Sequence, residues 1–205
     1  MIALAEICGA FSVAGMNTLE WVAAGLGVIN VGLLVRRSIW NYPFALAMVT
    51  LYFFVFYEAK LYSDMLLQPF FFAINLFGWW NWLNAKRATG EVQVGLLSLR
   101  ARLLWAAGTV AGSLAWGMAM HRFTDAAYPF IDAFVAGASI SAQILLARRK
   151  LENWPVWILV DVVAIGLYWS RDLHYTAGLY CLLLILSIAG FIDWRRKLLA
   201  QARPA

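Results

Sequence analysis

An internal repeat is the feature that most constrains the fold of this chain. Residues 148–155, RRKLENWP, echo residues 36–43, RRSIWNYP, at an offset of 112 positions. The same offset carries the GWWNW segment at 78–82 onto GFIDW at 190–194 without a gap. One shift held over about sixty residues is typical of a duplicated structural unit. The fold must therefore accommodate the same unit twice.

Composition places both copies in a membrane. The 205-residue chain is 63% apolar and only 13% charged, whereas soluble domains carry about a quarter charged residues. The net charge is +5, but the basic residues form short clusters between apolar runs, so we expect no nucleic-acid partner. Cys8 and Cys181 lie far apart in apolar runs, which predicts neither a disulfide framework nor a metal site.

Seven apolar runs approach the length of roughly 17 to 25 residues that a spanning helix needs. They extend from Leu19 to Val35, Tyr42 to Tyr57, Leu66 to Leu83, Leu103 to Met120, Tyr128 to Ala147, Trp154 to Trp169 and Ala177 to Asp193. The segment from Met1 to Met16 is also apolar but lacks a basic leading region. We expect it to lie along the membrane interface or to insert partly, rather than to be a cleaved signal peptide.

Lys and Arg predict the orientation, because short basic loops stay in the cytoplasm. Only Lys60, Arg122 and Arg171 follow the even-numbered runs. Thirteen basic residues follow the odd-numbered runs: Arg36, Arg37, Lys86, Arg87, Arg100, Arg102, Arg148, Arg149, Lys150, Arg195, Arg196, Lys197 and Arg203. The N-terminus is therefore expected outside and the C-terminus in the cytoplasm.

The repeat offset spans four crossings, so the second copy should face the same way as the first. This predicts an all-α integral membrane protein with seven transmembrane helices arranged 3+1+3, as two parallel triple-helix repeats around a linking helix. The predicted divisions are an N-terminal segment (1–18), a first bundle (19–85), a linker with the linking helix (86–125), a second bundle (126–197) and a cytoplasmic tail (198–205). Such repeats are one of the plans of transporters, with substrate held between them near mid-membrane.

The sixth run carries the one ionisable residue deep in a span, Asp161. Trp154, Trp157, Asp161 and Tyr168 share one helix face by their spacing. A deep carboxylate is a functional candidate by default. The alternative is a packing role, in which Asp161 bonds a neighbouring helix.

The third run carries a second stripe of Gln68, Asn75, Trp79 and Trp82. The offset transfers it to Tyr180, Ser187, Phe191 and Trp194 on the seventh run. Asn30, Ser139 and Gln143 lie at similar depth on the first and fifth runs; for Ser139 helix packing is the favoured role.

Symmetry is broken at the sixth run, because the offset pairs Asp161 with Val49 and Trp157 with Ala45. A lopsided ligand is therefore expected, with a flat or cationic part against the sixth run and a hydroxylated part near amides. No Lys or Arg lies deep in a span, which disfavours a phosphorylated ligand. No catalytic motif is present, so we expect neither an enzyme nor a cofactor.

Two runs resemble the PnuC vitamin transporters: LLQPFFFAINLFGWWNW from Leu66 to Trp82, and RKLENWPVW from Arg149 to Trp157. The similarity covers roughly Glu20 to Trp194. It implies a homotrimeric importer of nicotinamide riboside in the lipid bilayer of the bacterial inner membrane, with a fold related to the SWEET sugar transporters. It also implies facilitated diffusion, with a cytoplasmic kinase that traps the substrate. A pyridinium ring would suit the aromatic wall, and a ribose would suit the amides.

We therefore expect a uniporter whose bundles expose a central site alternately to each side. Expected roles are stacking for Trp79, Trp157 and Tyr180, hydrogen bonding for Gln68, Asn75 and Gln143, and charge or positioning for Asp161. The alternatives are transport of another vitamin such as thiamine or riboflavin, a SWEET-type sugar carrier, and a heptahelical receptor or assembly protein that transports nothing. A neutral sugar has no use for a deep carboxylate, and the short loops leave little surface for signalling.

Overall fold

The computed structural model describes residues 18–58, 62–123, 128–170 and 174–201, and these parts contain seven helices, as predicted. The predicted segment from Met1 to Met16 lies outside the described residues. The helices are α2 (Thr18–Val35), α3 (Asn41–Glu58), α4 (Tyr62–Thr89), α5 (Leu99–Phe123), α6 (Pro129–Ala147), α7 (Asn153–Trp169) and α8 (His174–Gln201).

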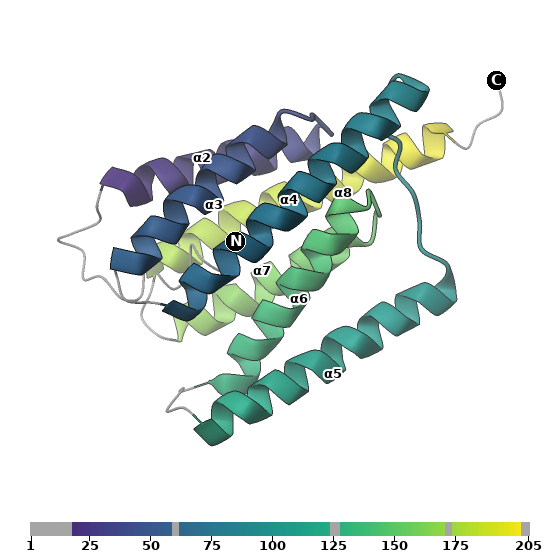
Figure 1. Ribbon diagram of the computed structural model, residues 1–205. Coiled ribbons are helices and arrows are strands. Elements are labelled where there is room, and N and C mark those ends of the chain that lie inside the picture. Colours follow the sequence, from purple (N-terminus) through teal and green to yellow (C-terminus); the bar gives the residue numbers. More distant parts are fainter. Residues whose placement is uncertain (1–17, 59–61, 124–127, 171–173, 202–205) are drawn as a thin grey trace.

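The helices pack in chain order within each half of the molecule. In the first half α2 packs on α3 and α3 on α4, and in the second half α6 packs on α7 and α7 on α8. The halves meet where α2 touches α8 and where α4 touches α6. Helix α5 packs against α6 and runs along the lower edge of the molecule in Figure 1, apart from the other helices.

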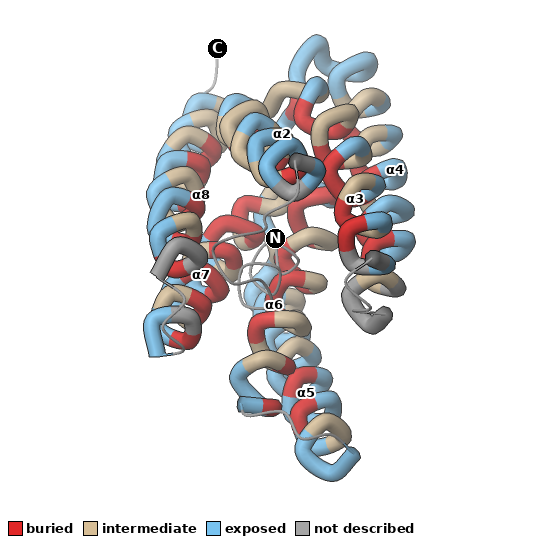
Figure 2. The backbone as a smooth tube through the Cα atoms, turned by 90° about the vertical axis from the view of Figure 1, so that its left-hand side faces the viewer, coloured by how far each residue is buried: buried red, intermediate tan, exposed pale blue. Residues whose placement is uncertain are grey.

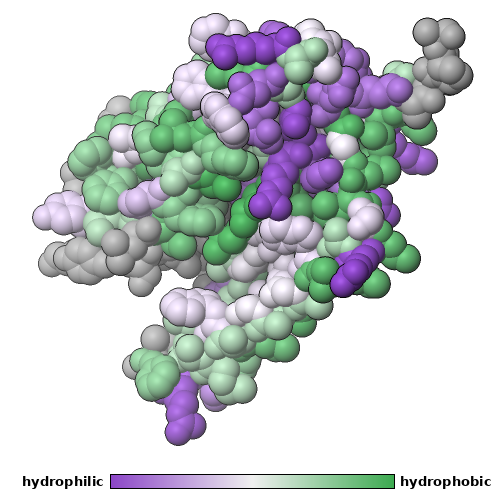
Figure 3. Space-filling model, turned by 45° about the vertical axis from the view of Figure 1, so that its right-hand side comes forward, coloured by the Kyte–Doolittle hydropathy of each residue, from purple (hydrophilic) through white to green (hydrophobic). Residues whose placement is uncertain are grey.

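Apolar residues cover much of the surface. Among the described residues, three helices are long and apolar enough to cross a membrane, over Leu99–Phe123, Pro129–Ala147 and Ala177–Gln201. Shorter apolar helices occupy Trp21–Val35, Asn41–Val55 and Asn153–Leu167. Buried residues lie on the sides of the helices that face one another, whereas α5 is mostly exposed (Figure 2). Hydrophilic residues gather at the upper end of the molecule in Figure 3.

The repeated RR segments form the same turn in both halves. The backbone N–H groups of Arg37 and Ser38 bond the carbonyls of Leu34 and Leu33, and those of Arg149 and Lys150 bond Leu146 and Leu145. This pairing is the Schellman motif, which satisfies the last carbonyls of a helix. Its left-handed residue is usually Gly, but here it is Arg37 (φ 53°) and Arg149 (φ 58°).

The turns also fix the start of the helices that follow them. Asn41 Nδ2 donates to the Ser38 carbonyl and Asn153 Nδ2 to the Lys150 carbonyl, both at 2.6 Å. Pro43 and Pro155 come two residues after these asparagines, in the first turn of α3 and α7, where a missing N–H costs little. One local sequence therefore gives one local structure twice.

Each half also donates a tryptophan hydrogen bond to the Schellman turn of the other half. Trp82 Nε1 on α4 donates to the Leu146 carbonyl, and Trp194 Nε1 on α8 donates to the Leu34 carbonyl, both at 3.3 Å. Next to these tryptophans, Asn81 donates to the Ala147 carbonyl at 2.8 Å, and Asp193 forms an ion pair with Arg37. The two tryptophan bonds are reciprocal under the offset, because Leu146 corresponds to Leu34. Together with the contacts of Asn81 and Asp193, they hold the two halves together at this end of the molecule.

The connection between α4 and α5 is hydrogen-bonded to the second turn. Gly95 and Leu97 bond the α6–α7 connection through the Arg149 carbonyl and Glu152 Oε1, each at 3.0 Å. Glu152 also pairs with Arg102 at 2.8 Å. The offset pairs Glu152 with Trp40 in the first half, so the bonds to the Glu152 carboxylate have no counterpart there.

Candidate functional site

A narrow cavity of about 50 Å³ lies between the two halves. Helices α2, α3 and α4 of one half and α6, α7 and α8 of the other half contribute lining residues, and α5 contributes none. The polar side chains of the lining are those of Asn30, Tyr52, Gln68, Asn75, Gln143 and Ser187. Trp154 and Trp157 supply the large aromatic surface, and no lining residue is basic.

Amides from both halves meet in the cavity wall. Gln143 Nε2 on α6 donates to Asn75 Oδ1 on α4 at 3.1 Å, across the contact between the halves. Asn75 Nδ2 donates to the Phe71 carbonyl one turn earlier at 2.8 Å. Asn30 Oδ1 is buried and accepts no hydrogen bond from any described residue. A buried acceptor without a donor is costly, so a ligand hydroxyl at this place would be favourable.

Helix α7 supplies the aromatic wall. Trp157 and Trp154 are both nearly fully buried, and they are one turn apart on the same helix face. The indole N–H of Trp154 has no acceptor among the described residues. Trp154 packs edge-on against Trp194, with ring centroids 5.6 Å apart. This aromatic packing leaves the Trp154 ring little freedom to move.

Asp161 lies behind this wall rather than in it. Its side chain is fully buried, and Ser187 Oγ on α8 donates to Asp161 Oδ2 at 2.8 Å. Ser187 itself lines the cavity, whereas Asp161 does not. The hydroxyl of Ser187 therefore separates the carboxyl group from the cavity.

The structure brings four of the predicted site residues together in the cavity: Gln68, Asn75, Gln143 and Trp157. The other two aromatic candidates lie elsewhere. Trp79 lines a separate hollow near Arg36 and Lys86 at the polar end of the molecule. Tyr180 is buried in an apolar cluster with residues that include Val31 and Ala164.

Sequence reasoning did not find Tyr52, a nearly fully buried cavity residue on α3. It lies in the run YFFVFY, where no polar neighbour distinguishes it from packing aromatics. One signal was available. Tyr52 follows Ala45 and Val49 by seven and three positions, and these are the offset partners of Trp157 and Asp161. The helix face that matches the α7 stripe therefore includes Tyr52.

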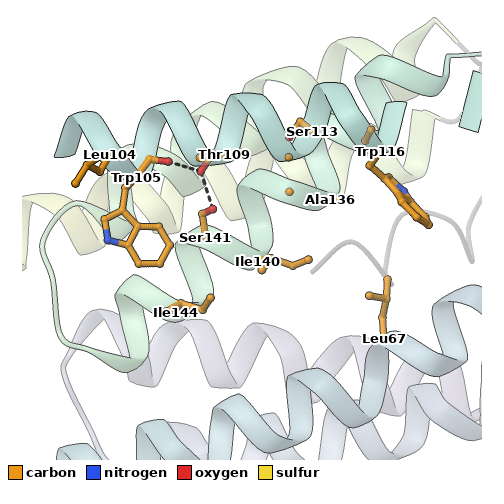
Figure 4. A pocket seen from close by; sticks show the side chains of 14 residues that line it. Leu67, Leu104, Trp105, Thr109, Ser113, Trp116, Ala136, Ile140, Ser141 and Ile144 are labelled. Atoms are coloured by element: carbon orange, nitrogen blue, oxygen red, sulfur yellow. Dashed lines mark hydrogen bonds between the residues drawn. The ribbon is translucent and has the colours of Figure 1, made fainter. Parts of the chain in front are cut away.

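A larger hollow of about 770 Å³ lies between α5 and α6, with Leu67 of α4 at its edge (Figure 4). Its floor contains small residues such as Gly108, Gly112 and Gly137. Thr109 Oγ1 donates to the Trp105 carbonyl at 2.8 Å and lies 2.7 Å from Ser141 Oγ. These hydroxyls are thus already bonded, and the hollow is a mainly apolar groove that offers a polar ligand few partners.

The sequence model of the nicotinamide mononucleotide transporter family matches residues 17–196. The chain belongs to this family. Similar proteins include the nicotinamide riboside transporter PnuC of Escherichia coli strain K12, which is 28% identical with 88% of this chain and 87% of the relative covered. PnuC of Neisseria mucosa is 31% identical, over 85% of this chain and 71% of the relative.

Two further similarities bear on the substrate and the fold. The riboflavin/roseoflavin transporter RibM of Streptomyces davaonensis is 28% identical, over 87% of this chain and 85% of the relative. The crystal structure of the vitamin B3 transporter PnuC matches with a TM-score of 0.71 at 28% identity, covering 90% of this chain and 83% of the other. This member of the nicotinamide mononucleotide transporter family is therefore a multi-pass membrane transporter, not an enzyme.

Proposed function

We propose that the protein imports nicotinamide riboside by facilitated diffusion through the cavity between its halves. The observation that carries this proposal is the composition of the cavity wall, in which amides from three helices face the tryptophans of α7. Tryptophan is the best aromatic partner for a cationic ring, and amides suit ribose hydroxyls. The names of the PnuC relatives point to the same substrate.

The same wall argues for the riboside over its phosphate. A phosphate group requires an Arg, a Lys or several backbone N–H groups to replace its hydration. No residue that lines the cavity is basic, and the polar side chains are neutral. A mononucleotide would therefore enter at a large desolvation cost.

For the architecture we propose the two parallel triple-helix repeats of the SWEET plan, divided as predicted, with α5 as the linking helix. The pairing of α2 with α8 and of α4 with α6 supports this, because an exact repeat would exchange these two contacts. A cavity of about 50 Å³ holds only a few water molecules, so the halves must separate to admit a riboside. We propose alternating access around this cavity.

For the setting we propose a homotrimer in the bacterial inner membrane, with the N-terminus outside and the C-terminus in the cytoplasm. This orientation is supported by the polar end of the molecule in Figure 3 and by the hollow at the α2–α3 turn, whose lining includes Arg36, Arg37 and Lys86. The homotrimer is supported by the exposed helix α5, which carries Gly108 and Gly112 along the groove. This is the small-residue spacing at which membrane helices pack closely.

Riboflavin is the second candidate, because RibM is similar over most of its length. Its isoalloxazine ring is flat and fits an aromatic wall, but it is neutral and much larger than a pyridinium ring. We therefore expect it to bind more weakly than nicotinamide riboside.

A ligand panel on the purified protein tests this proposal. We expect nicotinamide riboside to change the Trp fluorescence with a dissociation constant at least tenfold below those of its phosphate, thiamine, riboflavin and glucose. We also expect the protein to take up labelled riboside into vesicles without an imposed ion gradient. Preference for the phosphate would contradict the proposed recognition, and preference for riboflavin would favour the second candidate.

A further inference from the structure

Four buried aromatic side chains form a continuous row beside the two Schellman turns. In order along this ring row they are Tyr42, Trp82, Trp194 and Trp154, and each is at most 1% exposed. Neighbouring ring centroids lie 5.4, 5.6 and 5.6 Å apart. The repeat offset exchanges the two outer rings with each other and the two inner rings with each other. The middle of the ring row therefore lies on the boundary between the halves.

The outer contacts of the ring row are each made within one half. The rings meet edge-on in both, with interplanar angles of 87° in the first half and 85° in the second. A Cβ atom on Gly78 would lie 2.7 Å from the Tyr42 hydroxyl oxygen. A Cβ atom on Gly190 would lie 2.3 Å from the Trp154 ring. Each outer pair is thus packed too closely to rearrange independently of its own half.

The central contact, between Trp82 and Trp194, joins the two halves and can be broken at low cost. Each indole N–H donates to a carbonyl of the opposite half at 3.3 Å, beyond the usual range of roughly 2.7–3.2 Å. The two acceptors, the carbonyls of Leu146 and Leu34, also accept a backbone N–H within their own Schellman turns, at 2.8 and 2.9 Å. Separation of the halves therefore leaves neither carbonyl without a donor, and the indole N–H groups can bond water.

The ring row lies between the cavity and the polar end of the molecule. Trp82 and Trp194 follow the cavity residues Asn75 and Ser187 by seven positions, which is about 10 Å along each helix toward the polar end. Trp154, the last ring of the row, lines the cavity itself. The central contact therefore closes the path from the cavity to this end.

We propose that Trp82 and Trp194 form the gate that closes the cavity toward the cytoplasm, an inference that rests on the proposed alternating access. The gate opens when the two indoles separate and their hydrogen bonds to the opposite turns break, while each outer pair of rings moves with its own half. The ion pair between Arg37 and Asp193, next to Trp194 in the chain, adds a second contact that must break.

A reporter cysteine in the cavity tests this gate. Ala45 lines the cavity and is 1% exposed, so Ala45→Cys should react with a membrane-impermeant maleimide only when the cavity opens. The reporter is placed in the full-length protein with Cys8→Ala and Cys181→Ala, and labelling is measured from each side in right-side-out and inside-out vesicles. Trp82→Phe and Trp194→Phe keep a ring but lose the N–H donor. Each should accelerate labelling from the cytoplasmic side about fivefold without accelerating labelling from outside.

Trp80 provides a matched control, because it lies on the same helix as Trp82 but is 61% exposed. Trp80→Phe should leave both labelling rates unchanged. If the gate variants do not fold, Asp193→Ala replaces them, since its side chain is 44% exposed and its loss should accelerate cytoplasmic labelling about twofold. Unchanged cytoplasmic labelling in folded variants would overturn the gate. Faster labelling from outside, alone or together with the cytoplasmic side, would also overturn it.

The labelling measurement needs no riboside, so it separates the gate from the proposed cargo. Faster cytoplasmic labelling of the gate variants, together with a parent protein that neither binds nor takes up nicotinamide riboside, would support the gate and overturn the proposed function. Riboside uptake by the parent protein, together with unchanged labelling of the gate variants, would overturn the gate and leave the cargo as proposed.

Discussion

Replacing Gly190 by alanine is expected to lower the melting temperature of the purified protein by roughly 10 °C, because an added methyl group has no space there. A Cβ atom on Gly190 would lie 2.3–2.6 Å from three carbon atoms of the Trp154 ring. Trp154 is almost fully buried and packs against Trp194, so the ring cannot turn aside. Overpacking of a rigid core costs about 3 kcal/mol at the upper end of its usual range.

Gly178 offers a matched control on the same helix. No atom lies within 4 Å of a Cβ atom placed on it, and alanine in a helix interior is more stable than glycine by roughly 0.5–1 kcal/mol. Gly178→Ala should therefore leave the melting temperature unchanged or raise it slightly. Thermal unfolding in detergent, followed by circular dichroism, compares the two variants. Equal melting temperatures would contradict the rigid packing of Trp154 against α8.

The repeat could be predicted from sequence because it depends on short local segments. The similar segments at 36–43 and 148–155 form the same Schellman turn and the same asparagine bond twice. The glycines at 78 and 190 are repeated for a related reason, since each faces an aromatic residue at equivalent positions, Tyr42 and Trp154. Such features need no knowledge of how distant helices meet.

The cavity could be predicted only in part, because helical spacing gives the face of a residue but not its neighbours. Asn75 and Trp79 share a face of α4, but Trp79, one turn nearer the polar end, meets the α2–α3 turn instead of the cavity. Tyr180 matches Gln68 under the offset, yet it packs against Val31 and Ala164. Which residues of a shared face reach the centre depends on how the halves meet, and the repeat pattern does not contain that information.

The depth of Asp161 within its helix likewise did not predict where its carboxyl group lies relative to the cavity. The sequence placed it on the face of Trp157, and both residues are buried. The turn from Trp157 to Asp161 carries the carboxyl group behind Ser187. The partner of the carboxyl group on α8 was a consequence of packing between α7 and α8, which one helix pattern alone cannot give.

Replacing Trp157 by leucine is expected to weaken the binding of nicotinamide riboside roughly 30-fold. The indole is 3% exposed and lines the cavity, and a desolvated cation on a tryptophan face is worth about 2 kcal/mol, which corresponds to this factor. Trp157→Phe keeps an aromatic face and should lose no more than about tenfold. Isothermal titration calorimetry on the purified variants measures the dissociation constants without relying on tryptophan emission.

Trp116 on α5 provides the same substitution outside the cavity. Its side chain is 56% exposed and lines the groove beside α6, so Trp116→Leu should bind the riboside as the wild type does. Comparison of leucine with phenylalanine at position 157 separates the loss of the aromatic face from the loss of volume, because both replacements are apolar and smaller than tryptophan. If the Trp157→Leu and Trp157→Phe variants bound the riboside equally well, Trp157 would act by filling space. The cation would then have to be recognised elsewhere in the cavity.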